Sequence, residues 1–222
     1  TTVTSDITIS FDGTKICVTV EPYNTVQFSN NGQASATGMP ANQYVPTGGK
    51  VSEPSAPSLY GYGFGGWYKE AACTNAWNFS TDVVSTNTTL YAKWIPTLSV
   101  ASVADVVITA MAAGGSAIAE GSHANVDYNK TVTLNYSSLT DGKGLTWKVY
   151  KTGDESTVVS VSGTGNGATF TMPAYPVTVS AVIETVPYYA LTVDEEIVGG
   201  TIEADPTEHL EFGQQVELSA SP

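Results

Sequence analysis

Few side chains in this sequence could act as a nucleophile, a general base or a metal ligand. The only imidazoles are those of His123 and His209, and the only thiols are those of Cys17 and Cys73. The two histidines are far apart in the chain, and neither has a partner at the short spacing that a zinc site or a nucleophilic triad uses. We therefore expect no metal centre, no cofactor and no Ser-His-Asp type of active site.

Acidic pairs are more frequent, and Asp154-Glu155 and the run 194–196 could in principle supply the acid and base of a glycosidase. That chemistry needs two carboxyl groups about 5–10 Å apart across a cleft, with one of them partly desolvated. These acids lie in polar loop sequence, which is typical of solvated charge. The glycine-rich stretches 61–66 and 163–167 lack the strand, helix and lysine context of a phosphate-binding loop, so we interpret them as turns. The sequence thus predicts a protein that is not an enzyme.

Aromatic rings are the remaining candidates for a binding role, because they crowd between residues 60 and 94. Most of them are expected to fill the interior of a small module, Phe64, Trp67 and Phe79 in particular. The rings best placed to be exposed, and so to stack on a sugar or a protein partner, are Tyr60, Tyr68 and Trp77. The last two are chosen because Tyr68 alternates with Trp67 along a strand and Trp77 lies in a connection.

The elements that would position these rings recur along the chain. A valine strand near Val26 is followed by a proline-rich connection, a glycine-aromatic stretch at 61–68 and a closing strand at 89–94. A degraded copy begins near Val107, and a third opens at Leu191, so the interval is about 80 residues, in the range of repeat architectures. The second copy has an extended loop around residues 153–166. The third contains only the first half of the pattern.

The first copy closely resembles the internalin B-type repeat, also called the Listeria-Bacteroides repeat, over about residues 23–95. The residues that carry the resemblance are Val26, Phe28, Val51, Pro54, Pro57, the run from Gly61 to Tyr68, Ala72-Cys73-Thr74, the run from Ala76 to Ser80, and the run from Thr89 to Trp94. The later copies resemble divergent members of the same family. Their evidence is Phe170-Thr171-Met172-Pro173 and the pattern that ends at Pro222.

The resemblance implies small β-grasp-like modules, joined in arrays on secreted or surface-attached bacterial proteins, with no catalytic residues. We expect a hairpin or the end of an upstream repeat at 1–23, a first unit at 24–96, a divergent unit at 97–186 and an incomplete unit at 187–222. Pro96 and Pro187 mark the joints, which are short. The units are therefore expected to form a semi-rigid rod.

Composition agrees with a mostly β protein. The chain has 222 residues, 41% of them hydrophobic, with 21 Gly and 11 Pro, and its runs of β-branched and aromatic residues are interrupted by turn formers. Helix is expected at most in short pieces, and residues 74–84 are the one segment that we considered. No apolar run is long enough for a transmembrane helix, and the first twenty residues lack the pattern of a signal peptide.

The net charge is −13, from 21 acidic and 8 basic residues, and arginine is absent. Such a chain repels phosphate backbones and anionic membranes, so nucleic-acid and membrane partners are excluded. We expect an extracellular or cell-surface location.

The N-terminal residues 1–23 alternate apolar and polar residues around Asp12-Gly13, which predicts a hairpin. Two interpretations stay open: an extra hairpin packed on the first unit, or the back half of a repeat with bare sheet edges that could pair with another chain. For the cysteines, the family's lone cysteine at the position of Cys73 favours a buried thiol. A Cys17–Cys73 disulfide is the alternative, if the hairpin packs on the first unit in an oxidising compartment.

Taken together, the sequence predicts a non-enzymatic repeat segment of a bacterial surface protein, acting as a stalk, spacer or adhesive region. Its partner would be a host or bacterial surface protein or a glycan. The competing hypothesis is a carbohydrate-binding module, for which Tyr60, Tyr68 and Trp77 would have to form one flat patch.

Overall fold

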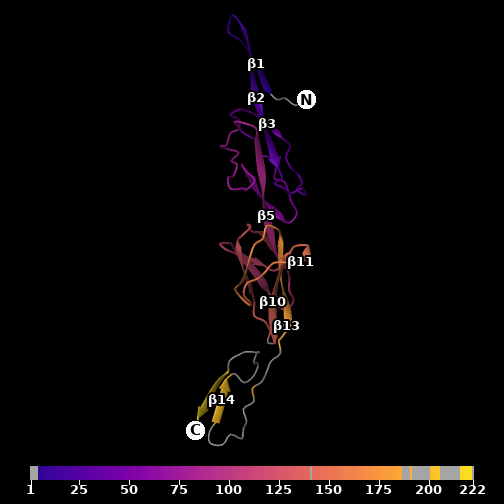
Figure 1. Cartoon of the computed structure of the whole chain (residues 1–222), viewed down its shortest axis with the longest axis vertical. Helices are drawn as coiled ribbons and strands as arrows, with labels where there is room; N and C mark the ends of the chain where they lie inside the picture. The colour runs from indigo at the N-terminus through magenta and orange to yellow at the C-terminus, as the bar shows by residue number, and fades with distance from the viewer. Residues whose placement is uncertain (1–4, 141, 187–190, 192–200, 206–215, 222) are drawn as a thin grey trace. The chain divides into compact units, whose positions relative to one another are not determined.

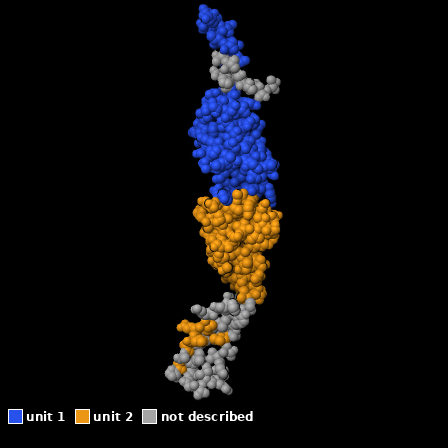
Figure 2. Space-filling model, viewed as in Figure 1, with its two compact units in different colours: residues 1–97, 125–128 blue, residues 98–124, 129–222 orange. Residues whose placement is uncertain are grey.

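The computed structural model describes residues 5–140, 142–186, 191, 201–205 and 216–221, and within these residues it contains strands and no helix (Figure 1). The prediction of a mostly β protein is confirmed. The chain divides into two compact units, unit 1 with residues 1–97 and 125–128, and unit 2 with residues 98–124 and 129–222 (Figure 2).

Unit 1 is built around the parallel pairing of residues 26–29 with residues 88–91. Its strands are β1 (Ser5–Phe11), β2 (Ile16–Ser29), β3 (Gln43–Pro46), β4 (Tyr62–Tyr68) and the first part of β5 (Thr88–Val100). The end of β2 lies parallel to β5, with Phe28 opposite Leu90, while β3 pairs antiparallel with β2. β4 pairs antiparallel with β5 and places Trp67 opposite Ala92.

A bulge in β4 explains the spacing of the motif that dominates the sequence. The register of β4 shifts between Phe64 and Trp67, and Gly66 lies there at a φ of +100°, which an L side chain rarely adopts. Without the bulge, side chains three residues apart would point to opposite faces of the sheet. With it, both rings reach the core. The interpretation of residues 61–66 as a turn is therefore wrong for most of the run, since residues 62–66 lie inside β4.

The core of unit 1 is aromatic. Trp67 is 3% exposed. It packs in an edge-to-face arrangement with Phe28 and Phe64, whose ring centroids lie 4.8 and 5.3 Å from that of Trp67. Phe64 also meets Trp94 at 5.7 Å. The buried cluster consists of Val26, Val45, Val51, Trp67, Val84, Leu90 and Ala92, with Phe28, Met39, Phe64, Trp77, Phe79 and Trp94 packed against it. The expectation that Phe64, Trp67 and Phe79 form the interior is confirmed.

The part of unit 2 before residue 187 contains two sheets. Its strands are the end of β5 and then β6 (Ile108–Ala112), β7 (Ala117–Ala119), β8 (His123–Asn125, whose last residue belongs to unit 1), β9 (Thr131–Tyr136), β10 (Lys143–Lys151), β11 (Asp154–Val158), β12 (Ala168–Thr171) and β13 (Val177–Thr185). In one sheet, residues 98–100 of β5 run parallel to β13, which pairs with β10, and β11 pairs with β10. The other sheet has the order β12-β9-β6-β7.

The interior of unit 2 is largely aliphatic and is supplied by both sheets. Its fully buried large side chains are Leu98, Val100, Ile108, Val132, Leu134, Val149, Met172, Val177 and Val179. The same strand scheme as in unit 1 recurs, because the first strand again lies parallel to the last and the last pairs antiparallel with the tryptophan strand. The opening strand of this scheme is Leu98–Val100, not the strand near Val107 that the sequence suggested.

The segment considered as a short helix, residues 74–84, forms turns instead. The side chain of Asn78 accepts a hydrogen bond from the Ser80 amide at 2.9 Å, and a carboxylate oxygen of Asp82 accepts one from the Asn78 amide at 2.8 Å. These local side-chain bonds compete with helical pairing, which is the usual behaviour of Asn and Asp in turns.

The N-terminal residues form the predicted hairpin, since β1 pairs antiparallel with the first half of β2 from Ser5↔Pro22 to Phe11↔Ile16. Asp12 closes the turn by accepting 2.8 Å bonds from the amides of Thr14 and Lys15. Residues 7–18 are all exposed, so this part of the hairpin does not pack on unit 1. Whether residues 1–23 are an extra hairpin of unit 1 or the end of an upstream repeat stays a prediction.

The third predicted unit is described only in part. β14 (Thr201–Asp205) and β15 (Glu217–Ser221) form an antiparallel pair. Its register places Ala204 opposite Leu218. The remaining residues of this unit, apart from Leu191 and residue 216, lie outside the described part of the chain.

Candidate functional site

The three predicted binding rings occupy different environments in unit 1. Tyr60 is 92% exposed, in the turn that the Tyr62 amide closes by donating to the Leu59 carbonyl at 3.1 Å. Tyr68 is half-buried at the other end of β4, and Trp77 is half-buried against the core cluster. Only Tyr60 therefore presents a free ring face.

A lysine side chain lies over the ring of each of the other two residues, Tyr68 and Trp77. The ammonium group of Lys93 lies 5.8 Å from the Tyr68 ring centroid and 3.1 Å from Asp127, and the hydrogen bond to Asp127 raises the pKa of this lysine. Lys69 stands 5.6 Å from the Trp77 ring centroid. Such cation–π contacts use the ring faces that a sugar would need.

The three rings do not form one flat patch. Tyr60 and Tyr68 flank the two ends of β4, which at about 3.3 Å per residue separates them by roughly 20 Å. Trp77 packs toward the interior. The arrangement required by the carbohydrate-binding hypothesis is thus not formed by these residues.

Both cysteines carry free thiols in the structure, so the Cys17–Cys73 bridge is not present. Cys17 is exposed on the hairpin. Cys73 is half-buried at a φ of 53°, within 3.4 Å of the Asn31 amide nitrogen. Burial raises the pKa of the Cys73 thiol, which makes it a poorer nucleophile at neutral pH.

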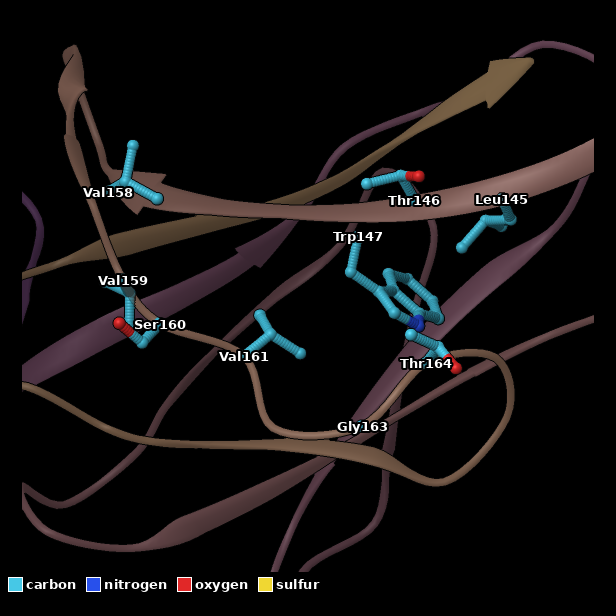
Figure 3. Close-up of a pocket in the computed structure, with 9 residues that line it drawn as sticks. All are labelled: Leu145, Thr146, Trp147, Val158, Val159, Ser160, Val161, Gly163 and Thr164. Atoms are coloured by element: carbon cyan, nitrogen blue, oxygen red, sulfur yellow. The ribbon is translucent and has the colours of Figure 1, made fainter.

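A hollow in unit 2 is a binding feature that sequence reasoning missed. It encloses about 280 Å³ and is lined by Leu145, Thr146 and Trp147 of β10, Val158 of β11, and Val159, Ser160, Val161, Gly163 and Thr164 of the following loop (Figure 3). This loop is the extension that the sequence comparison places around residues 153–166. The extension therefore has a structural effect: it forms a wall opposite the tryptophan strand.

The ring of Trp147 is held in place from the loop side. Its indole N–H donates to the Gly165 carbonyl at 2.8 Å, and the Tyr136 ring is 6.1 Å away in a tilted arrangement. Gly163 and Gly165 both have positive φ, which lets the loop fold back beside the ring. The signal in the sequence was the coincidence of a glycine-rich insertion with a tryptophan strand, which we interpreted only as a turn and a repeat marker.

The hollow is better suited to binding a ligand than to catalysing a reaction of that ligand. Among its nine lining residues there is no carboxylate, imidazole, thiol or amine, and its polar groups are the hydroxyls of Thr146, Ser160 and Thr164. A general acid or base is therefore absent from the lining. Its volume lies near the lower end of ordinary ligand pockets.

Asp154 and Glu155, the acidic pair that could serve glycosidase chemistry, are the first two residues of β11, directly after a turn at the surface. Asp154 accepts hydrogen bonds from the hydroxyls of Ser156 and Thr157 at 2.6 and 2.7 Å, which lowers the pKa of Asp154 to about 2. Glu155 pairs with Lys148. Asp154 thus lacks the desolvated, raised-pKa environment of a catalytic acid, and Glu155 is exposed. The run 194–196 and His209 lie outside the described residues.

The described part of the chain contains no cluster of three or more His, Cys, Asp or Glu side chains that could hold a metal ion. Within the same residues, no helix has the length and apolarity needed to cross a membrane.

The strand scheme of unit 1, with its parallel first and last strands and the antiparallel tryptophan strand, defines a small all-β module. Residues 24–93 match the family model of the Listeria-Bacteroides repeat domain, which confirms the resemblance for unit 1. The assignment of the later copies to divergent members of this family stays a prediction.

Similar proteins come from two bacteria. A protein of Evansella cellulosilytica named as a Gly-rich membrane protein is 41% identical over 70 residues, which is 32% of this chain and 8% of the relative. A second membrane protein of that organism is also 41% identical over 70 residues, or 10% of its length. Internalin H of Listeria monocytogenes is 33% identical over 88 residues, 39% of this chain and 15% of the relative. The chain thus matches only a small part of each relative's length.

Proposed function

We propose that this chain is a non-enzymatic, extracellular spacer segment of a bacterial surface protein. In this proposal, tandem β-grasp-like repeats set the distance between an anchor and a functional part. The observation that carries it is the recurrence of one strand scheme, with a parallel first and last strand, in two successive units. Repeat arrays of this kind gain extent by adding units rather than by enlarging one core.

The relatives support the surface location, because their names describe membrane proteins and an internalin. The net charge of −13 supports it further, since an acidic coat keeps an extended chain soluble. The lack of titratable groups in the hollow beside Trp147 supports a role without catalysis.

A spacer needs joints with little slack, and the residues that leave unit 1 are firmly held within it. Pro96 is buried, and its carbonyl accepts a bond from the Val126 amide at 3.0 Å. The Thr97 amide donates to the Gly61 carbonyl at 2.9 Å. These bonds fix the chain up to the last residue before unit 2 begins in the sequence. We expect a semi-rigid rod as a result.

The spacer role is testable by surface display. The whole chain would be placed between a cell-wall anchor and an N-terminal epitope, and antibody binding to intact cells compared with the same epitope on the anchor alone. We expect a clear gain in accessible epitope, larger than a short flexible linker gives. No gain at equal expression would contradict the proposal.

Glycan or peptide binding is the second candidate, favoured by the hollow beside Trp147 rather than by Tyr60, Tyr68 and Trp77. An aromatic ring in a hollow that also contains hydroxyl-bearing residues is suited to stacking on a sugar ring. Ser160→Trp would fill the hollow without altering Trp147. If a glycan array shows binding by the natural chain, this variant should lose it, while Tyr60→Ala should keep it. An array without any binding would remove the glycan candidate.

A further inference from the structure

The hollow beside Trp147 lies along a stretch of β10 that has a partner strand on one side only. β11 pairs with β10 at two positions, which are Tyr150↔Val158 and Lys151↔Asp154. The Val159 amide still donates to the Val149 carbonyl at 2.8 Å. The residues that follow Val159 line the hollow opposite β10 (Figure 3). Within the described part of the chain, residues 145–147 therefore pair with β13 but with no strand on the β11 side.

The backbone groups of Leu145 and Trp147 point toward this open side. In an antiparallel ladder, residues alternate between hydrogen-bonded and non-hydrogen-bonded pairs. The Val149 carbonyl bonds to the loop on the β11 side, and the carbonyl of Val179, its partner on β13, accepts a 2.8 Å bond from the Ala101 amide. Both bonds point away from the β10–β13 ladder, so Val149↔Val179 is a non-hydrogen-bonded pair. Trp147 and Leu145, two and four residues earlier, have the same orientation.

The lining of the hollow fits an extended peptide with an apolar side chain. Trp147, Leu145 and the valines at 158, 159 and 161 supply apolar surface, and none of the nine lining residues is charged. A peptide lying along β10 would direct alternate side chains into the hollow and the others to solvent. A sugar ring could stack on Trp147, but it could not extend the ladder. The net charge of −13 favours a peptide whose outward side chains are basic.

We propose that the hollow binds a short extended peptide, apolar at its centre and basic at its flanks, which adds to the free edge of β10 as a strand. The peptide backbone exchanges hydrogen bonds with Leu145 and Trp147, and its central side chain contacts the Trp147 ring and the loop valines. This inference rests on the second candidate function above and names its ligand class. Only two edge residues contribute backbone bonds, so the affinity is modest and falls as salt screens the charges.

Selection from a phage-displayed library of random heptapeptides against the whole chain tests the proposal, and the probe for later steps is the enriched peptide, synthesised with blocked ends. We expect enriched sequences with an apolar centre and an excess of Lys and Arg. Ser160→Trp fills the hollow and should lose the binding. Ser138→Trp is the matched control, because it adds the same ring at an exposed position outside the hollow, and it should bind like the natural chain. Near-UV circular dichroism checks that both variants are folded.

Amide hydrogen exchange resolved by NMR separates strand addition from other modes of binding, and it needs only the natural chain. The amides of Leu145 and Trp147 should exchange rapidly in the free chain and slow by about tenfold or more with the peptide bound. The amides of Thr146 and Lys148 face β13, so they should be protected in both states.

A library without any enriched sequence would overturn the proposal. A bound peptide that leaves the exchange of Leu145 and Trp147 unchanged would also overturn it. If instead a glycan binds, is lost in Ser160→Trp and leaves this exchange unchanged, the hollow is a sugar site and not a peptide site. Surface display of the Ser160→Trp chain keeps the spacer function separate, because its gain in accessible epitope should equal that of the natural chain whatever the peptide result.

Discussion

Units 1 and 2 share a strand scheme but use their tryptophans in opposite ways. Trp67 lies at the centre of the unit 1 core and is 3% exposed. Trp147, on the equivalent strand of unit 2, is half-buried and lines a hollow beside an extended loop. This difference indicates that the strand pairing defines the module, whereas the aromatic motif is only one of the ways in which its core can be packed. A divergent unit can release a ring from the core for other contacts.

The largest expected effect is the loss of the unit 1 core. Trp67→Ala removes the ring that contacts both Phe28 and Phe64, and a buried Trp→Ala change costs about 3–5 kcal/mol. Urea denaturation followed by near-UV circular dichroism should show a transition lost or moved to much lower urea. The transition that remains should be that of unit 2.

The comparison is sharpened by Trp147→Ala. Here the losses are one hydrogen bond to Gly165 and a ring contact with Tyr136, together worth about 1–2 kcal/mol. The urea midpoint of unit 2 should fall modestly while unit 1 is unchanged. A cost equal to that of Trp67→Ala would break the comparison, because it would make Trp147 a core residue.

Gly63→Ala should destabilise unit 1 through its contact with residues 125–128. A Cβ at Gly63 would lie 2.0 Å from the Asn125 side-chain nitrogen, so the amide must move and lose its bond with Thr97. Such crowding costs about 1–3 kcal/mol.

The control for this crowding is the double variant Gly63→Ala with Asn125→Ala. It should recover much of the lost stability, since the clash disappears with the side chain. Thermal melting of the two single variants and the double variant gives the coupling energy. Strict additivity would contradict the contact.

The smallest expected effect concerns the β10–β11 turn, for which unit 1 has no counterpart. The Asp154 pKa of about 2 is below the ordinary aspartate value. A depressed pKa stabilises the folded state at pH values above the ordinary pKa, and this contribution is lost as the pH falls through about 2. NMR titration of the carboxyl carbon should give that midpoint, and Ser156→Ala should raise it. An unchanged midpoint in the variant would show that the hydroxyl is not the cause.

The features that could be predicted from the sequence are those that depend on short, local residue patterns. The β-rich content, the turn at Asp12-Gly13 and the aromatic core around Trp67 follow from residue types at fixed spacing. It could not place Leu98–Val100 as the first strand of unit 2, because a parallel pairing with β13 joins residues far apart in sequence. It also missed the hollow beside Trp147, since only the folded loop brings Gly163 and Thr164 to that ring.

The alternation of apolar and polar residues also predicts the wrong sheet face where a strand contains a bulge, and it does not report whether an apolar face is buried. Phe64 and Trp67 share a core only because of the bulge at Gly66. The hairpin's apolar alternation predicted its strands correctly, but it did not report that Ile9 and Val18 are exposed in the folded chain.

The central claim, that these repeats form a spacer, is tested most directly by small-angle X-ray scattering of the whole chain, extrapolated to zero concentration so that association does not contribute. The account predicts a distance distribution with an early peak and a long tail, and a radius of gyration well above the value of about 17 Å for a compact chain of 222 residues. A single symmetric peak with a radius of gyration near that compact value would contradict it.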